Sequence, residues 1–368
     1  MISGGDGCRR LTVRVGDFDL WFEVPDSLPL TSGGEFLACA GLLPAMARGE
    51  PLVLPEAWPL DQVFHDNLER VQAKLIEFQD RLKVRLHRIE VVAALRAGTP
   101  PARAGAMAFF SGGVDGSYTA LSNRERITAL VLLRGIDMQL DNQSLWDRAL
   151  ESANLVAGHW GLPLATVSTN IRFLGYHYGL KWAHTFQGAG LAALAHLTPF
   201  EQTLIAASHS LEDMTGFASH PDLDILWASS VTAVEHDGAI RRTAKIAELV
   251  TDPVVLSRLR VCWHDQGYNC CRCEKCLRTM IALRLLGAPM PSFSEGLDLG
   301  LIGMLGTDQG GRVDYIRELD DLEREHPGPE IRVALDRLLA SERRRSVLRR
   351  LDRATGGLLS SVKPMVRR

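Results

Sequence analysis

Long apolar runs are missing from this sequence. Although 46% of its 368 residues are hydrophobic, no stretch approaches the roughly 18 consecutive apolar residues of a membrane-spanning helix. Residues 1–6 also lack the positive charge and the apolar segment of a secretory signal. We therefore expect no membrane span, and we expect the protein in the cytoplasm.

The sequence also lacks a large excess of charge of either sign. It has 41 Lys and Arg against 44 Asp and Glu, a formal net charge of −3. Such a balance gives no general attraction to nucleic acid. Only the tail 341–368 is strongly basic, and it alone leaves a polyanionic partner open. We expect a small-molecule substrate, and we leave a homodimer open.

Turn-forming residues divide the chain into three predicted parts. Residues 10–24 alternate apolar and polar side chains around Gly16-Asp17, which predicts a β-hairpin. Residues 60–95 have apolar side chains at helical spacing, and the Gly-, Pro- and Ala-rich stretch 97–105 ends that pattern. The predicted parts are a β-rich and helical accessory domain at 1–98, a catalytic domain at 99–290 and a helical C-terminal extension with a basic tail at 291–368.

Strand and helix patterns alternate in the middle of the chain. Short apolar runs at 106–110, 129–133 and 164–168 are separated by helical patterns at 117–126 and 145–160. This alternation predicts an α/β fold in which a parallel sheet has helices on both faces. Ligands of such folds bind at the carboxyl ends of the strands, so the residues after 106–110 are the first candidates for a site.

A glycine-rich segment lies at that position and extends from Ser111 to Ser117. Its glycines let backbone N–H groups approach phosphate oxygens, and the helix after it adds partial positive charge. No Lys follows Gly116, so this is not a Walker A loop. A dinucleotide fingerprint would need glycine at Ser111, with Asp137 as its ribose-binding acid. Asp115 argues against it, because a carboxylate would repel a pyrophosphate unless Mg²⁺ bridged them.

Four of the seven cysteines have metal-ligand spacing. The predicted ligands are Cys262, Cys270, Cys273 and Cys276. Four thiolates in so short a segment suit tetrahedral Zn²⁺. An iron–sulfur cluster stays open, because C-x2-C-x2-C also begins a ferredoxin ligand run, but that run would continue with a cysteine where Met280 stands. We therefore favour zinc, and we expect Cys271 to be a passive neighbour.

The segment from Phe110 to Asp115 resembles the signature of the PP-loop ATP pyrophosphatase superfamily, which has the adenine nucleotide alpha hydrolase-like fold. With the cysteines, residues from about 105 to 290 resemble its 7-cyano-7-deazaguanine synthase (QueC)-like branch. The resemblance implies an ATP-dependent ligase that cleaves ATP to AMP and pyrophosphate, with Mg²⁺ and Zn²⁺. A carboxylate or amide oxygen would be adenylated and then attacked by a nitrogen or sulfur nucleophile. The family pattern ends in Asp-Ser, whereas here Gly116 separates Asp115 from Ser117.

The same resemblance implies which residues hold ATP. The nucleotide-binding residues would be Ser111, Gly112, Gly113, Val114, Asp115, Gly116, Ser117, Gly135 and Ile136. A Lys near position 245 is expected to hold phosphates, and Arg242, three residues before Lys245, would share its helix face. We expect Asp115, Lys245 and Arg242 to be the catalytic residues.

The polar turn 219–227 falls where this fold places its substrate pocket, so His220 and Asp224 are the predicted substrate contacts. Three other functions fit parts of the sequence. A PP-loop thiolating enzyme could act on tRNA or on a small molecule, a nicotinamide-dependent oxidoreductase would depend on Asp137, and a non-catalytic nucleotide-binding protein would explain Gly116 as a sign of a decayed loop.

Overall fold

The computed structural model describes residues 2–5, 7–30, 33–96, 105–214, 217, 219–264, 267–305 and 312–340. The chain forms two compact units, Met1–Tyr268 and Asn269–Arg368. The basic tail 341–368 and most of the predicted boundary at 97–105 lie outside the described residues. Within the described ranges, no helix is long and apolar enough to cross a membrane.

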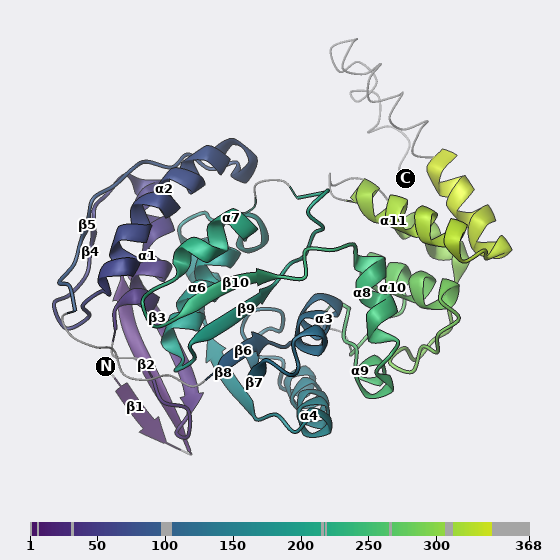
Figure 1. Ribbon diagram of the computed structural model, residues 1–368, viewed down its shortest axis with the longest axis horizontal. Coiled ribbons are helices and arrows are strands. Elements are labelled where there is room, and N and C mark those ends of the chain that lie inside the picture. The colour runs from purple at the N-terminus through teal and green to yellow at the C-terminus, as the bar shows by residue number, and fades with distance from the viewer. Residues whose placement is uncertain are drawn as a thin grey trace, which may run out of the picture. The chain divides into compact units, whose positions relative to one another are not determined.

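The first unit is built on one large sheet (Figure 1). Its strands are β1 (Ile2–Gly5), β2 (Cys8–Val15), β3 (Phe18–Pro25), β6 (Ala106–Phe109), β7 (Ile127–Arg134), β8 (Leu164–Thr169), β9 (Gln202–Ala206) and β10 (Ala233–Asp237). In the described part of the chain they form eight strands in the order β1-β2-β3-β8-β7-β6-β9-β10. Neighbours from β8 to β10 are parallel, whereas β1, β2 and β3 are antiparallel and β3 pairs antiparallel with β8. The N-terminal strands therefore extend the central sheet.

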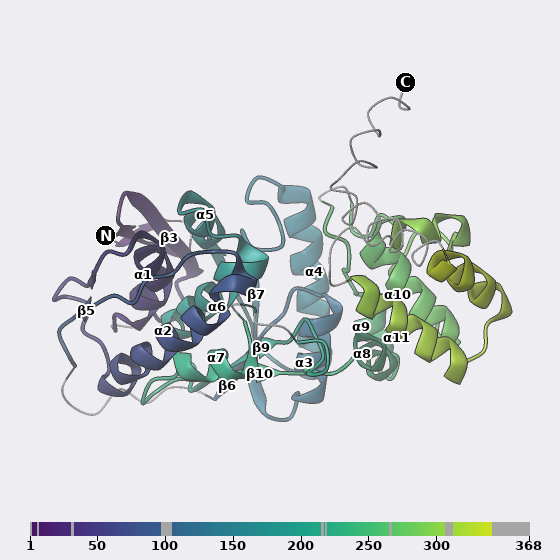
Figure 2. The same cartoon turned by 90° about the horizontal axis from the view of Figure 1, so that it is seen from above.

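Helices cover both faces of this sheet (Figures 1 and 2). On one side lie α3 (Val114–Ser122), α4 (Gln143–Trp160), α8 (Arg242–Leu249) and α9 (Pro253–Ser257). On the other lie α1 (Glu35–Arg48), α2 (Gln62–Leu82), α5 (Ile171–His177), α6 (Gln187–Leu197), α7 (Pro221–Asp224) and the short helices η1 (Trp182–Phe186) and η2 (Ile225–Trp227). The predicted α/β class is confirmed, and the PP-loop form of that class stays a prediction.

The order of the strands defines where a ligand would bind. From β6 the chain moves to β7 and then to β8 through α3 and α4, and it then crosses to β9 on the opposite side of β6. Connections after β6 and after β9 therefore turn to opposite faces of the sheet. This reversal is a topological switch point, and in open α/β sheets ligands bind at the carboxyl ends of the strands that flank it.

The N-terminal elements follow simple sequence rules. The hairpin of β2 and β3 turns at Gly16-Asp17, as expected, and Gly16 has a positive φ of 59°. Helix α2 begins after Asp61, whose side chain accepts a hydrogen bond from the N–H of Phe64. The helix ends at residue 82, and the rest of the predicted helical stretch 60–95 includes strand β5 (Val91–Val92), which pairs in parallel with β4 (Leu52–Val53).

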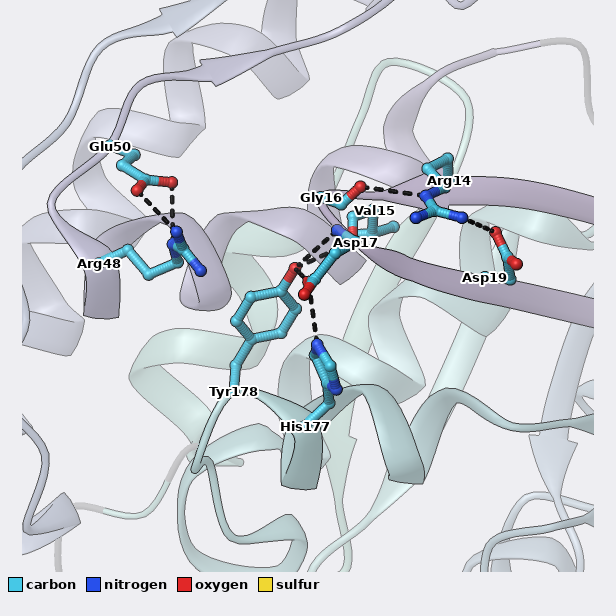
Figure 3. A network of polar contacts seen from close by, with 9 residues as sticks. All are labelled: Arg14, Val15, Gly16, Asp17, Asp19, Arg48, Glu50, His177 and Tyr178. Atoms are coloured by element: carbon cyan, nitrogen blue, oxygen red, sulfur yellow. Dashed lines mark hydrogen bonds and ion pairs between the residues drawn. The ribbon is translucent and has the colours of Figure 1, made fainter.

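A polar network joins the hairpin turn to the end of α5 (Figure 3). The Asp17 carboxylate lies 2.9 Å from His177 Nε2 and 2.9 Å from the Tyr178 hydroxyl. Hydrogen bonds from His177 and then Tyr178 lower the pKa of Asp17 from 3.8 to about 2. The ionised carboxylate therefore contributes stability that is fully present above pH 3.8 and is lost as the pH falls through about 2. Asp17 and His177 are solvent-exposed, so we interpret the network as an anchor for the hairpin.

The described part of the second unit is mainly helical. Its elements are α10 (Glu274–Leu285), η3 (Leu299–Leu305), α11 (Arg312–Glu325) and a further helical segment at 329–340. The buried Arg278 lies 3.1 Å from Glu274 one helical turn away, and its guanidinium lies 3.9 Å from the centre of the Tyr315 ring. This contact joins α10 to α11 inside the unit.

Candidate functional site

The glycine-rich segment has the backbone shape of a phosphate loop. Strand β6 ends at Phe109, and α3 begins at Val114 with Gly113 as its N-cap. Gly112 has φ +75°, a conformation that favours glycine, and a Cβ there would lie 3.4 Å from the carbonyl oxygen of Arg258. The N–H groups of the first turn of α3 have no acceptor within the helix. The expected strand, glycine turn and helix N-terminus are therefore all present.

The three predicted catalytic residues lie together at the switch point. Asp115, in the first turn of α3, binds Arg242 Nη1 at 2.7 Å and Lys245 Nζ at 3.0 Å. Both cations come from α8, as their spacing predicts. Lys245 Nζ also donates a hydrogen bond of 2.6 Å to the carbonyl oxygen of Ala207, the residue after β9. One ion-paired cluster thus joins the carboxyl ends of β6 and β9, the two strands at which the sheet reverses direction.

The charges of this cluster favour an anionic ligand. The Lys245 side chain is 1% exposed and that of Arg242 is 9% exposed, whereas Asp115 keeps 22% of its surface. Two buried cations from one helix thus lie beside the glycine turn. Because charges attract more strongly away from water, a buried cation binds an opposite charge more tightly than a surface cation does. The partly exposed Asp115 is the member of the trio that a ligand or its metal ion can reach.

Gly116 and Ser117 show why the loop departs from the family pattern. A Cβ at Gly116 would lie 3.0 Å from the carbonyl oxygen of Phe109, in the backbone of β6. Ser117 is fully buried, its hydroxyl has no hydrogen-bond partner among the residues that the structure describes, and its N–H donates to the carbonyl oxygen of Gly113. Glycine at 116 therefore fits its surroundings, and the predicted contact of Ser117 with nucleotide stays a prediction.

A methyl group at position 116 is expected to destabilise the protein. Gly116→Ala should lower the free energy of unfolding by about 1–3 kcal/mol, because the strand backbone must move to admit the new atom. Gly116→Ser should likewise not increase activity. Urea denaturation tests the stability, with Gly158→Ala as the matched control in α4, where a Cβ meets nothing within 4 Å. A Gly116→Ala protein as stable as the control would contradict the steric explanation.

The turn after β7 presents backbone groups to a ligand. Gly135 has φ +94°, and a Cβ there would lie 2.0 Å from the carbonyl oxygen of Thr169, so only glycine fits. The Ile136 side chain is buried, and its carbonyl oxygen accepts a hydrogen bond from Arg172. These observations agree with a role of the backbone in binding adenosine, which stays a prediction for both residues.

Arg260 is a component of the site that the sequence did not reveal. Its N–H donates a hydrogen bond of 2.8 Å to the carbonyl oxygen of Gly112. Its Nη2 donates one of 3.0 Å to the carbonyl oxygen of Asp137, while the Asp137 side chain is exposed. Arg260 thus bridges the turns that follow β6 and β7. No motif predicts this position, and the one available signal is its location two residues before a predicted metal ligand.

The predicted substrate residues have structural partners. His220 Nδ1 accepts a hydrogen bond from the N–H of Asp222 at the start of α7, and burial lowers the His220 pKa. Asp224 is fully buried, accepts a hydrogen bond from the Ser219 hydroxyl and lies 2.7 Å from His236 Nδ1. His236 is a second residue that the sequence analysis did not predict, and it lies near the end of β10. Substrate contacts of His220 and Asp224 stay predictions.

The cysteine segment forms a cluster that suits a metal ion. The sulfur atoms of Cys262, Cys270, Cys273 and Cys276 all lie within 4.8 Å of one another. Tetrahedral Zn²⁺ with Zn–S bonds of about 2.3 Å holds its sulfurs about 3.8 Å apart. The separation of 3.9 Å between the sulfurs of Cys270 and Cys276 fits this geometry. The donor set is therefore compatible with Zn²⁺.

The surroundings of the cluster favour a set of four thiolates. The N–H of Cys273 points to the sulfur of Cys270 at 3.3 Å, and the N–H of His264 points to that of Cys262 at 3.4 Å. Cys271 is separate: its thiol lies 3.6 Å from the carbonyl oxygen of Asn269. Cys271 is therefore a neighbour of the cluster and not a fifth ligand, as expected from the sequence.

Comparisons of the chain with protein-family models, with curated proteins and with solved structures found no match. The α/β class and the grouping of the four cysteines are therefore supported by the structure alone. Membership of the PP-loop superfamily rests on the loop residues and stays a prediction.

Proposed function

We propose that this protein is an ATP-dependent adenylating enzyme of the PP-loop type, a ligase that activates a carboxylate or amide oxygen of a small molecule. One observation carries the proposal. Asp115 lies at a helix N-terminus after a glycine turn, and it is held by Arg242 and Lys245 at the switch point of a parallel sheet. Phosphate binding at helix N-termini and ligand binding at switch points are general properties of α/β folds.

In the proposed reaction the substrate oxygen attacks the α-phosphorus of ATP. The new O–P bond forms as the bond to the bridging oxygen breaks, and the electron pair leaves with pyrophosphate. A nitrogen or sulfur nucleophile then attacks the activated carbon, and AMP leaves. Loop N–H groups, Lys245 and Arg242 would stabilise the charge that develops on the phosphates. Mg²⁺, bound through Asp115, would neutralise further charge on the leaving pyrophosphate.

The cysteine cluster has a structural role in this proposal. Cys262 lies two residues after Arg260, and the Arg260 N–H donates a hydrogen bond to the carbonyl oxygen of Gly112. A metal ion on Cys262 would therefore fix the end of the segment that supports the phosphate loop. The four cysteines would bind Zn²⁺ with a closed ligand set, which is typical of structural sites and not of catalytic ones.

The proposal is tested by the products formed from ATP. The protein is incubated with Mg·ATP and a metabolite extract, nucleotides are separated, and AMP adducts are sought by mass spectrometry. We expect AMP and pyrophosphate in equal amounts, and exchange of labelled pyrophosphate into ATP. Formation of ADP without AMP, or an absence of ATP binding, would refute the proposal.

A thiolating PP-loop enzyme is the second candidate, because all four donors of the cluster are sulfur. Such an enzyme could carry an iron–sulfur cluster on the same cysteines. Purified protein would then be brown and contain iron and sulfide, whereas the zinc-containing ligase would be colourless. A nicotinamide-dependent enzyme would instead bind NAD(H) and depend on the Asp137 side chain.

A further inference from the structure

Arg260 carries a buried positive charge that has no carboxylate partner in the part of the chain that the structure describes. It is 4% exposed, and within the described ranges it has no ion pair. Its Nη2 bonds to a neutral carbonyl, and its Nε is buried without a hydrogen-bond partner in the same part of the chain. Arg242 and Lys245, by contrast, both pair with Asp115. Buried charges are normally paired or bound to a ligand, so Arg260 indicates a binding site for an anion.

The position of Arg260 limits which anion this is. Its backbone N–H donates a hydrogen bond to the carbonyl oxygen of Gly112, in the loop after β6. Its guanidinium donates one to the carbonyl oxygen of Asp137, in the turn after β7. Strands β6 and β7 are parallel neighbours, so both turns lie at the same edge of the sheet. In the proposed function the loop holds pyrophosphate and the second turn holds adenosine. The α-phosphate joins these two parts of ATP, and Arg260 joins the two turns.

We propose that Arg260 binds the α-phosphate of ATP and stays on it as this phosphate is transferred to the substrate. This assignment rests on the proposed function. A guanidinium can give two parallel N–H groups to the non-bridging oxygens of one phosphate, a geometry that an ammonium group does not offer. Arg260 gives up no proton. It stabilises the charge on the α-phosphate while the bond to the incoming oxygen forms and the bond to pyrophosphate breaks.

Separate binding of the two products of ATP cleavage tests the assignment. AMP contains the α-phosphate, whereas inorganic pyrophosphate occupies only the loop. Calorimetric titration of Arg260→Gln with AMP should show an affinity about 10- to 100-fold lower than that of the unchanged protein, the loss expected for a charged hydrogen-bonded contact. The affinity for Mg·pyrophosphate should change by less than about threefold, because pyrophosphate occupies only the loop and leaves the position of the α-phosphate empty.

Arg172→Gln is the matched control. Arg172 donates to the carbonyl oxygen of Ile136, in the same turn that Arg260 supports through Asp137. Loosening of the turn alone would therefore affect both variants equally. We expect Arg172→Gln to keep AMP affinity within about threefold of the unchanged protein. Equal losses in the two variants would overturn the assignment of Arg260 to the phosphate.

The remaining outcomes are also decisive. If Arg260→Gln keeps AMP affinity, or loses AMP and pyrophosphate equally, the assignment is wrong and the proposed function survives. If the unchanged protein binds neither ligand, the proposed function fails, and the assignment fails with it. Metal content and thermal unfolding show whether the variant is folded. If Arg260→Gln does not fold, Arg260→Lys, which keeps the charge, replaces it and should lose AMP affinity by about 5- to 10-fold.

Discussion

Asp115→Asn is expected to reduce AMP formation by about 100- to 1,000-fold, the usual effect of removing one preorganised electrostatic contact. Asparagine keeps the shape of aspartate and loses its charge. It would remove both the proposed Mg²⁺ ligand and the ion pairs, 2.7 and 3.0 Å long, that position Arg242 and Lys245. Because a neutral side chain at 115 would no longer compete with phosphate for the two cations, the affinity for pyrophosphate without Mg²⁺ should stay equal or increase.

Exchange of labelled pyrophosphate into ATP measures this loss, together with pyrophosphate titrations with and without Mg²⁺. Glu212→Gln is the matched control, because it removes a carboxylate from an exposed ion pair of 3.1 Å with Arg241, the residue before Arg242. Its exchange rate should stay within about twofold, since exposed ion pairs contribute little. A folded Asp115→Asn protein with nearly full activity would rule out the proposed role of Asp115.

Parts of the site that are continuous in sequence were predictable. The glycine turn lies between a short apolar strand and a helix, and its function depends on backbone conformations that glycine alone favours. The four cysteines lie within residues 262–276, so their spacing defines most of the geometry of the cluster. Arg242 and Lys245 share a face of α8 because they are three residues apart.

Other parts depend on contacts between distant segments. The strand β10 has the sequence Ala-Val-Glu-His-Asp, which has too few apolar residues for a strand pattern because it lies at the edge of the sheet. The sequence therefore does not predict that His236 lies on a strand. The antiparallel pairing of β3 with β8 also cannot be predicted from the sequence, because the paired residues Phe22 and Thr169 are far apart in it. Arg260 has no local pattern at all, because its role follows from Gly112 and Asp137.

The loop and the cysteine cluster share the segment from Arg258 to Cys262. A Cβ at Gly112 would lie 3.4 Å from the Arg258 carbonyl, and the Arg260 N–H donates to the Gly112 carbonyl. The segment therefore packs on the loop at one end and supplies a cluster cysteine at the other. A change in the cluster is thus expected to reach the loop through only two intervening residues.

Cys276→Ser is expected to remove the bound metal and to destabilise the fold. Cys276 is fully buried in the first turn of α10. Metal binding contributes directly to folding, by about 10–16 kcal/mol in zinc-finger peptides. Loss of one of four ligands should therefore lower the free energy of unfolding by at least about 3 kcal/mol and reduce the metal content from one ion per chain to a small fraction. Elemental analysis and thermal unfolding measure the two effects.

Cys271→Ser is a stringent control, because Cys271 is equally buried and adjacent to a predicted ligand, and yet its thiol faces the Asn269 carbonyl. It should keep the full metal content. In Cys276→Ser, AMP affinity should also fall at temperatures where the protein is still folded, because without the metal ion Cys262 restrains Arg260 and the loop less. If Cys276→Ser kept its metal, or if both variants lost it equally, the four cysteines would not be the ligands.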